Sequence, residues 1–215
     1  MENRIFQTGK LQQDRAYQEM LSPIATKAAM ENIFEMASRA GGCVLNQGNQ
    51  IMLRTFEKQV TVRIPECEIN PVLENWHALV LLHYIVNADG MPPTGEWISF
   101  EDMRNGLVRG TRFARASALW FSRFLKDKSI GQVESACLAL GGEKTEGRGD
   151  INISLFVFPN FPVLISLWDA DEDFDASGKI LLDRNADHYL TIEDAVTVGE
   201  IIQKQIEAHL PISGN

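Results

Sequence analysis

The sequence lacks the features that mark several large classes of protein. Its 215 residues include only three cysteines, which stand far apart and form no Cys-x-x-Cys pair, so neither a zinc knuckle nor an iron–sulfur cluster is predicted and the thiols are expected to be buried. No basic segment followed by an apolar one opens the chain, and the longest apolar run, residues 78–86, is far shorter than the roughly 20 residues that span a bilayer. These absences predict a cytoplasmic protein without a membrane partner.

Positive charge is also scarce. The chain has 20 lysines and arginines against 29 acidic residues, and its net charge of −9 repels nucleic acid, so no nucleic-acid partner is predicted. The motifs of several enzyme families are missing as well: there is no Gly-x-Ser-x-Gly, no cysteine beside a histidine and no glycine-rich phosphate-binding loop. The sequence therefore leaves open whether the protein is an enzyme.

The order of strand-like and helix-like segments predicts an α+β fold with a mostly antiparallel sheet. Alternating apolar residues indicate a hairpin over residues 50–64 and a meander of strands over residues 151–183. These strands do not alternate with helices as β-α-β units, which argues against a parallel sheet. Residues 1–20 are expected to form a helical arm and residues 21–215 a single domain.

Local start and stop signals predict the helices. Ser22 and Pro23 suit a first helical turn, and the helix that they open is expected to run to Gly41. Further helices are expected over residues 72–88, 111–126, 130–140 and 192–209. The last two begin with capping boxes, formed by Ser129 with Gln132 and by Thr191 with Asp194.

The stretch "VLISLWDADEDFDASG", residues 163–178, leads from an apolar run straight into five carboxylates. One interpretation is a phosphoryl-transfer Asp-x-Asp, with Asp169 as the nucleophile and Asp171 as the acid or base. A second is a calcium loop, because Asp169, Asp171 and Asp173 alternate as in the first half of an EF-hand. The third is a hydrated turn that discourages strand pairing, and it is preferred because it requires nothing further.

A second stretch, "DRNADHYLTIED", matches the EF-hand spacing more closely, although His188 stands where a glycine is usual. Helix capping by Thr191 and Asp194 explains much of the same pattern. Together the two stretches predict a candidate divalent-cation site, with ligands drawn from Asp169, Asp171, Asp173, Asp183, Asn185 and Asp187.

Six further residues are candidates for binding a ligand: His83, Trp97, Arg112, Arg115, Trp168 and His188. Arg112 and Arg115 lie one helical turn apart near a helix start, which suits a small anionic molecule, although they could equally neutralise the acidic stretch. His83 lies in an apolar helix, where a histidine is more often a hydrogen-bonded core residue than a metal or tetrapyrrole ligand.

Three segments are distinctive in combination: "LLHYIVNADGMPPTGEWISF", "FPVLISLWDADEDFDASGKILLD" and "HYLTIEDAVTVGE". Together they resemble the family called domain of unknown function 3786, over residues 78–200. The resemblance implies a protein of anaerobic bacteria or archaea with a place in corrinoid, iron–sulfur or methyl-transfer metabolism, and it supplies no site residues. The chain lacks the cysteine cluster of relatives fused to iron–sulfur domains. It also has Asp169-Ala170 and Asp175 where the family has Glu-Gly and proline, which puts a shared metal site in doubt.

The leading hypothesis is a ligand-binding or accessory protein without catalysis of its own. Its pocket is expected where residues 89–97, 168–175 and 183–190 come together, because Gly, Trp, Asp and His gather there beside strand ends. The alternative is a divalent-metal-dependent hydrolase or transferase that acts on an anionic small molecule through the aspartates of the acidic stretch and His188. A third hypothesis is a structural protein whose N-terminal arm docks a partner protein. The sequence specifies neither the ligand nor the oligomeric state.

Overall fold

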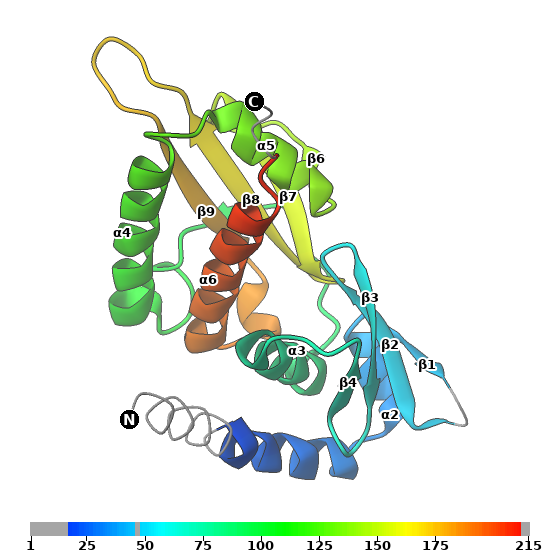
Figure 1. Cartoon of the computed structure of the whole chain (residues 1–215). Helices are drawn as coiled ribbons and strands as arrows, with labels where there is room; N and C mark the ends of the chain where they lie inside the picture. The colour runs from blue at the N-terminus through cyan, green and yellow to red at the C-terminus, as the bar shows by residue number, and fades with distance from the viewer. Residues whose placement is uncertain (1–16, 46–47, 212–215) are drawn as a thin grey trace, which may run out of the picture.

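Two antiparallel sheets and the helices around them make up the part of the chain that the computed structural model describes, residues 17–45 and 48–211 (Figure 1). Residues 17–30 are helical. They are followed by α2 (Ile33–Arg39), α3 (Asn75–Asn87), α4 (Gly106–Phe124), α5 (Ile130–Ala139) and α6 (Ile192–Ala208), with a short 3-10 turn over Ala186–His188 before α6. Within these residues no helix is long and apolar enough to cross a membrane.

The strands form one four-stranded sheet, in the order β1-β2-β3-β4, and one five-stranded sheet, in the order β5-β9-β8-β7-β6. The first sheet comprises β1 (Cys43–Leu45), β2 (Gln50–Thr55), β3 (Lys58–Arg63) and β4 (Glu68–Asn70). The second comprises β5 (Trp97–Ile98), β6 (Glu143–Lys144), β7 (Ile151–Phe158), β8 (Phe161–Trp168) and β9 (Ser177–Asp183). The predicted α+β class, hairpin and meander are confirmed, and the hairpin and the meander belong to separate sheets.

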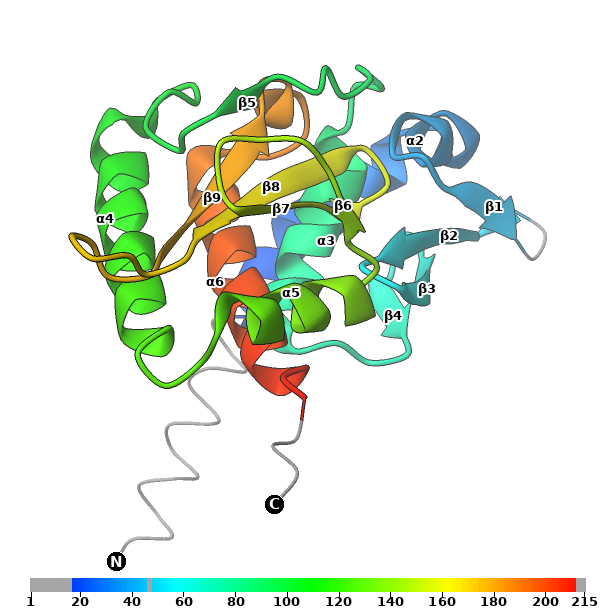
Figure 2. The same ribbon diagram turned by 90° about the horizontal axis from the view of Figure 1, so that it is seen from above.

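One continuous apolar core lies between the sheets and the helices. Helices α3, α4 and α6 lie along one face of the five-stranded sheet (Figures 1 and 2). Helix α3 is buried on nearly every side, as its apolar second half predicts. Its Tyr84 ring stacks on Phe158 and Tyr189, with ring centres 4.7 and 5.3 Å apart, so one side chain joins α3 to the end of β7 and to the loop before α6.

The two sheets meet at the turn of the β2–β3 hairpin. The backbone N–H of Phe56 donates to the carbonyl of Val157 on β7, at 3.0 Å. The hydroxyl of Tyr84 donates to the carbonyl of Ala40 at the end of α2 and accepts from the N–H of Asn160 in the β7–β8 turn, at 2.9 and 3.0 Å. These contacts fix the angle between the sheets and leave a cleft beside the junction.

The predicted start of the first described helix is wrong. Ser22 and Pro23 lie inside the helical residues 17–30 instead of opening a helix. The predicted run to Gly41 is interrupted because the side chain of Asn32 accepts from the N–H groups of Phe34 and Glu35 and so caps a new helix, α2. Of the expected arm, residues 1–16 lie outside the described part of the chain, and residues 17–20 belong to the helical segment.

Helix α4 begins at Gly106, five residues before the predicted start at Thr111. The early start depends on Gly106 and Gly110, which face the backbone at Phe100. A β-carbon at either glycine would lie 2.2 Å from the carbonyl oxygen of Phe100, so only glycine lets the helix approach this closely. Because Gly106 and Gly110 have no side chains, α4 starts earlier than predicted and packs closely against the segment that follows β5.

Candidate functional site

Two of the three loops that the sequence predicted to meet do come together. The buried carboxylate of Asp183, at the end of β9, accepts hydrogen bonds from the backbone N–H groups of Thr94 and Gly95, the hydroxyl of Thr94 and the N–H of Asn185, at 2.7 to 3.2 Å. Trp97 on β5 pairs in register with Asp183. Asp183 therefore holds the turn before β5 against the loop before α6.

A second contact closes this junction. Nδ1 of His188 lies 2.5 Å from the carboxylate of Asp89, and the hydroxyl of Tyr189 donates to the carbonyl of Met91. Burial alone would raise the pKa of Asp89, but its hydrogen bonds with His188 and with the N–H of Met91 outweigh burial and lower this pKa. A small polar cavity of about 340 Å³ lies here, and His188 and Asp187 are part of its wall.

His83 is hydrogen-bonded, but it is only partly buried and its partner is a carboxylate, so it is not a core residue. Its Nδ1 lies 2.7 Å from Oδ1 of Asp194, and the other carboxylate oxygen of Asp194 accepts from the hydroxyl of Thr191. Thr191 and Asp194 also form the predicted capping box of α6. The histidine thus links α3 to the first turn of α6.

The third loop, residues 169–176, lies at the opposite end of β9, so the three-loop pocket does not form. Trp168 pairs with Ser177 at one end of this strand, and Asp183 stands at the other. Six residue steps of about 3.3 Å separate these ends by about 20 Å. The loop and the strand ends that frame it are called the acidic hairpin below. Trp168 lies at its base and donates from its indole Nε1 to the carbonyl of Arg148 at 3.1 Å.

Two carboxylates of the acidic hairpin are bound to its own backbone. Asp169 accepts from the N–H of Ala170 at 3.0 Å, and Asp171 accepts from the N–H groups of Asp173 and Phe174 at 2.9 and 2.8 Å. Such bonds shape a turn, as in the preferred interpretation of this stretch.

Among the other candidate metal ligands, Asp183 and Asn185 make hydrogen bonds within the junction described above. Over the described residues, no three His, Cys, Asp or Glu side chains are grouped so that they could hold a metal ion.

Arg112 and Arg115 lie on α4, and both are exposed. No ion pair joins either guanidinium to the acidic hairpin within the described ranges. The sequence left open that Arg112 and Arg115 neutralise the acidic stretch. Within one chain these arginines make no direct ion pair with it.

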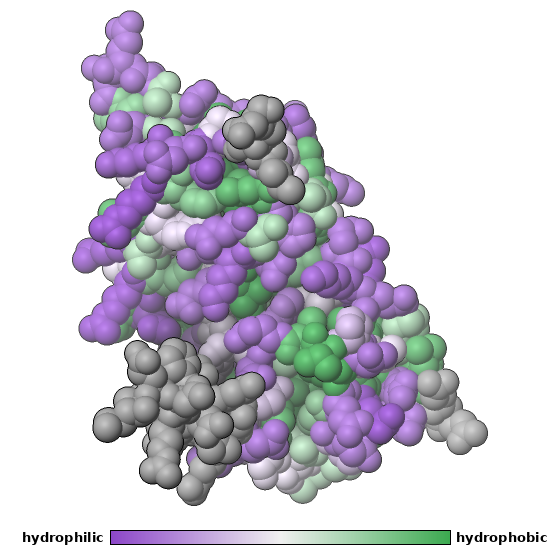
Figure 3. Space-filling view, in the orientation of Figure 1, coloured by the Kyte–Doolittle hydropathy of each residue, from purple (hydrophilic) through white to green (hydrophobic). Residues whose placement is uncertain are grey.

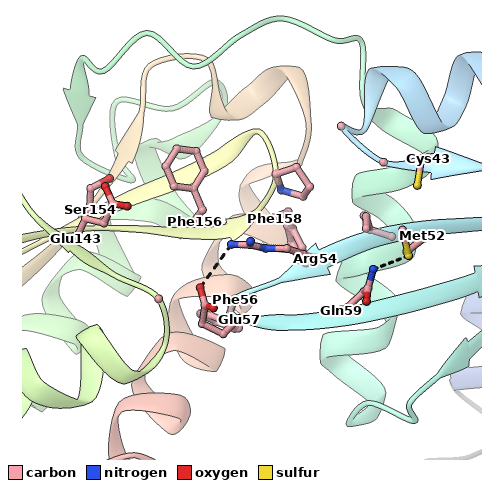
Figure 4. Close-up of a pocket in the computed structure, with 15 residues that line it drawn as sticks. Cys43, Met52, Arg54, Phe56, Glu57, Gln59, Glu143, Ser154, Phe156 and Phe158 are labelled. Atoms are coloured by element: carbon pink, nitrogen blue, oxygen red, sulfur yellow. Dashed lines mark hydrogen bonds and ion pairs between the residues drawn. The ribbon is translucent and has the colours of Figure 1, made fainter.

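One cleft of the described structure was not predicted from the sequence. A cleft of about 560 Å³ opens beside the contact between the β2–β3 hairpin and β7 (Figure 4). Its walls come from the glycines after α2, from the first three strands and from β6 and β7. We call it the inter-sheet cleft.

The floor of the inter-sheet cleft is apolar. Leu53, Phe56 and Phe158 line it and are at most 5% exposed, so their inner faces belong to the core. Phe156 is different: it lines the same cleft but is 46% exposed. An aromatic ring that is half open at the edge of a hollow offers a surface on which a flat ligand can stack.

The rim of the cleft is polar and charged. Arg54 and Glu57, both of the β2–β3 hairpin, form an ion pair of 3.5 Å at the rim (Figure 4). Cys43 and Met52 are direct cross-strand partners on β1 and β2, and both line the cleft. The prediction that all three thiols are buried is wrong for Cys43, which is exposed because it lies on the edge strand β1.

Behind the floor lies a buried histidine, His77. Its Nε2 lies 2.7 Å from the hydroxyl of Thr55, and its ring contacts Phe56 edge-on at 5.8 Å. Burial lowers the pKa of His77 to about 4, and the charge of Lys58 adds to this effect. The ring is therefore neutral at pH 7 and supports the aromatic floor without bringing charge into it.

The comparison with family models decides which family this is. Residues 32–205 match the model described as Domain of unknown function (DUF3786). The chain belongs to this family. No curated protein and no solved structure matches it.

The DUF3786 match extends well before residue 78, where the recognised sequence resemblance begins, and it includes the whole four-stranded sheet. Both walls of the inter-sheet cleft therefore belong to the DUF3786 domain. The sequence did contain a signal for the cleft, in the pairs Gly41-Gly42 and Gly141-Gly142. Each pair stands at the end of a predicted helix, and three of these glycines line the cleft. At Gly141 the backbone φ of +85° lies in the left-handed region that favours glycine.

Proposed function

We propose that this DUF3786 protein binds a small organic molecule in the inter-sheet cleft and has no catalytic activity of its own. The observation that supports the proposal is the cleft itself, whose volume of about 560 Å³ is within the usual range for ligand pockets, roughly 300–1,000 Å³. Such pockets combine an apolar lining with a few polar groups, and the cleft has both. A location between two sheets lets each sheet contribute one wall to a largely preformed site.

The lining suggests the chemical class of the ligand. A flat, mostly apolar body fits against Phe156 and the aromatic floor, and a polar end fits beside Arg54 and Glu57 at the rim. The alternative hydrolase or transferase depends on grouped metal ligands, which the described residues do not provide. Ligand binding is therefore the function that the geometry favours. The anaerobic cofactor setting remains an expectation from the family resemblance.

Native mass spectrometry of the freshly purified full chain tests the proposal by weighing any molecule that stays bound. Titration with the neutral aromatic dye N-phenyl-1-naphthylamine gives a second, independent measurement. We expect Phe156→Ala to weaken dye binding by about tenfold, because an aromatic contact of this kind contributes roughly 1.4 kcal/mol.

Phe174→Ala is the matched control, because Phe174 is also an exposed phenylalanine but lies in the acidic hairpin. This variant should bind the dye as the unaltered protein does. Ser154→Trp, which places a large side chain into the cleft from β7, should abolish binding without unfolding the protein. Equal affinity for the dye in all four proteins, or no binding at all, would overturn the proposal.

A further inference from the structure

The outer face of α4 carries a concentration of unpaired positive charge. Between Gly106 and Phe124 the helix has four arginines and no acidic residue. Arg109, Arg112, Arg115 and Arg123 are all exposed, and none makes an ion pair within the described ranges. In a chain with a net charge of −9, this face stands out as one that would attract an anionic partner.

An apolar hollow lies along the second half of the same helix, with a volume of about 550 Å³. Its walls include Leu119, which is 51% exposed, and the rings of Trp120 and Phe124, which stack with their centres 4.6 Å apart. Its charged lining residues are Arg123, Asp127 and Lys128, so two of the three are basic. We call this the α4 hollow. It suits an apolar side chain that is flanked by negative charge.

The acidic hairpin has this chemistry. Phe174, at its tip, is 74% exposed and is preceded and followed by Asp173 and Asp175. The carboxylate of Asp171 accepts from the N–H of Phe174, so the backbone that presents this ring is held in shape. The hairpin therefore presents an exposed apolar ring between two carboxylates, the combination that the α4 hollow suits.

The hairpin and the α4 face lie at the same end of the molecule. In Figure 1 the hairpin projects beyond the end of α4 that leads into α5, and in Figure 2 it projects past the side of this helix. A β-carbon at Gly178, just after the loop, would clash with the ring of Phe121 on α4. Hydrophilic side chains dominate the projecting hairpin and the adjacent edge over α4 (Figure 3). Projection away from the body makes the hairpin accessible to a second molecule.

We propose that two copies of this chain associate by docking the acidic hairpin of each on the α4 face of the other. Phe174 of one copy enters the α4 hollow of its partner copy, and the carboxylates around it pair with the arginines of that helix. Because the two surfaces lie side by side, a two-fold axis between the copies allows both contacts to form together. The equal total charges of the copies oppose association, so the dimer depends on local complementarity and weakens as salt rises.

Sedimentation velocity of the full chain tests this proposal over a range of concentrations up to about 100 μM, which detects dissociation constants in the micromolar range. We expect a monomer–dimer equilibrium that shifts toward monomer in high salt. Phe174→Ala should weaken the dimer by at least about tenfold, since it removes the aromatic anchor. Phe156→Ala, the matched control outside the interface, should leave the dimer unchanged.

A charge exchange gives the sharpest test. One variant carries Arg115→Glu and Arg123→Glu, and the other carries Asp173→Lys and Asp175→Lys. Each variant alone should be monomeric. In the first, an acidic α4 face would meet an acidic hairpin, and in the second, a basic hairpin would meet a basic α4 face, so both contacts become repulsive. An equal mixture should form a heterodimer in which both contacts are restored.

Three results would overturn the proposal. The unaltered protein could remain monomeric over the whole concentration range. A dimer could form that is insensitive to Phe174→Ala and to the charge reversals, and so uses another surface. The arginine face could instead bind vesicles of anionic lipid or single-stranded RNA while the protein stays monomeric, which would assign this surface to a different partner.

Discussion

Replacement of Asp183 by asparagine is expected to lower the free energy of unfolding by about 3 kcal/mol, because it disrupts several charge-assisted hydrogen bonds at once. The carboxylate is 2% exposed and accepts from two N–H groups and a hydroxyl of the Thr94-Gly95 turn and from the N–H of Asn185. An asparagine of the same shape keeps one acceptor oxygen and turns an NH₂ group toward these donors. Two donors then face each other in a buried place, where neither finds water.

The change should also be visible locally. Asp183 accepts all of the hydrogen bonds that Thr94 and Gly95 donate to β9, so the amides of these two residues should exchange hydrogen faster in the variant than those of β7 and β8. Urea unfolding followed by circular dichroism measures the stability, and hydrogen exchange at Thr94 and Gly95 measures the turn. Asp187→Asn is the matched control, because Asp187 is an exposed aspartate of the same loop. If Asp183→Asn is as stable as this control, the carboxylate does not hold the turn.

Acidification is expected to destabilise the protein through His77. In the folded protein the pKa of this histidine is about 4, against 6.5 for the free side chain, because the ring is buried and Lys58 is near. Between these pH values the unfolded chain binds a proton that the folded protein does not. The free energy of unfolding therefore has its full value above pH 6.5, and it falls as the pH drops from 6.5 toward 4, by about 3 kcal/mol from this one group.

The measurement is urea unfolding at several pH values between 7 and 4. His77→Gln removes the titrating ring but keeps a group that can hydrogen-bond to Thr55, so this variant should lose about 3 kcal/mol less than the unaltered protein over the same pH range. His209→Gln, at the end of α6, is the control for loss of a histidine elsewhere. Identical pH dependence in His77→Gln and the unaltered protein would show that His77 is not the group responsible.

Elements with a strong local signal were predicted correctly. The capping boxes at Ser129 and Thr191 are both present, and the β2–β3 hairpin and the β7–β8 pairing agree with the alternation of apolar residues. A capping box involves residues only three positions apart, and a hairpin pairs neighbours along the chain. Both features therefore depend on contacts between residues that are close in the sequence, so a local pattern can predict them.

Elements whose bounds depend on distant partners were predicted less well. Helix α4 starts at Gly106 because glycine lets it approach Phe100 closely, and that neighbour is known only from the packing. The acidic stretch was expected to join the pocket loops, but β9 runs between them. The candidate residues Trp97, Asp183 and His188 were brought together at one junction, whereas Trp168, Arg112 and Arg115 were not.

By itself, the sequence determined the class of fold, most of the helices and strands, and the family, because these follow from periodicity, capping and motif within short stretches of chain. Only the tertiary structure decided that the inter-sheet cleft forms. The inter-sheet cleft is made by individually ordinary residues that lie up to 118 positions apart, from Gly41 to Pro159. A cleft forms where two surfaces are held apart. The contacts that hold these surfaces in place join Phe56 to Val157 and Tyr84 to Ala40. These residues are far apart along the chain, so no local sequence pattern relates them.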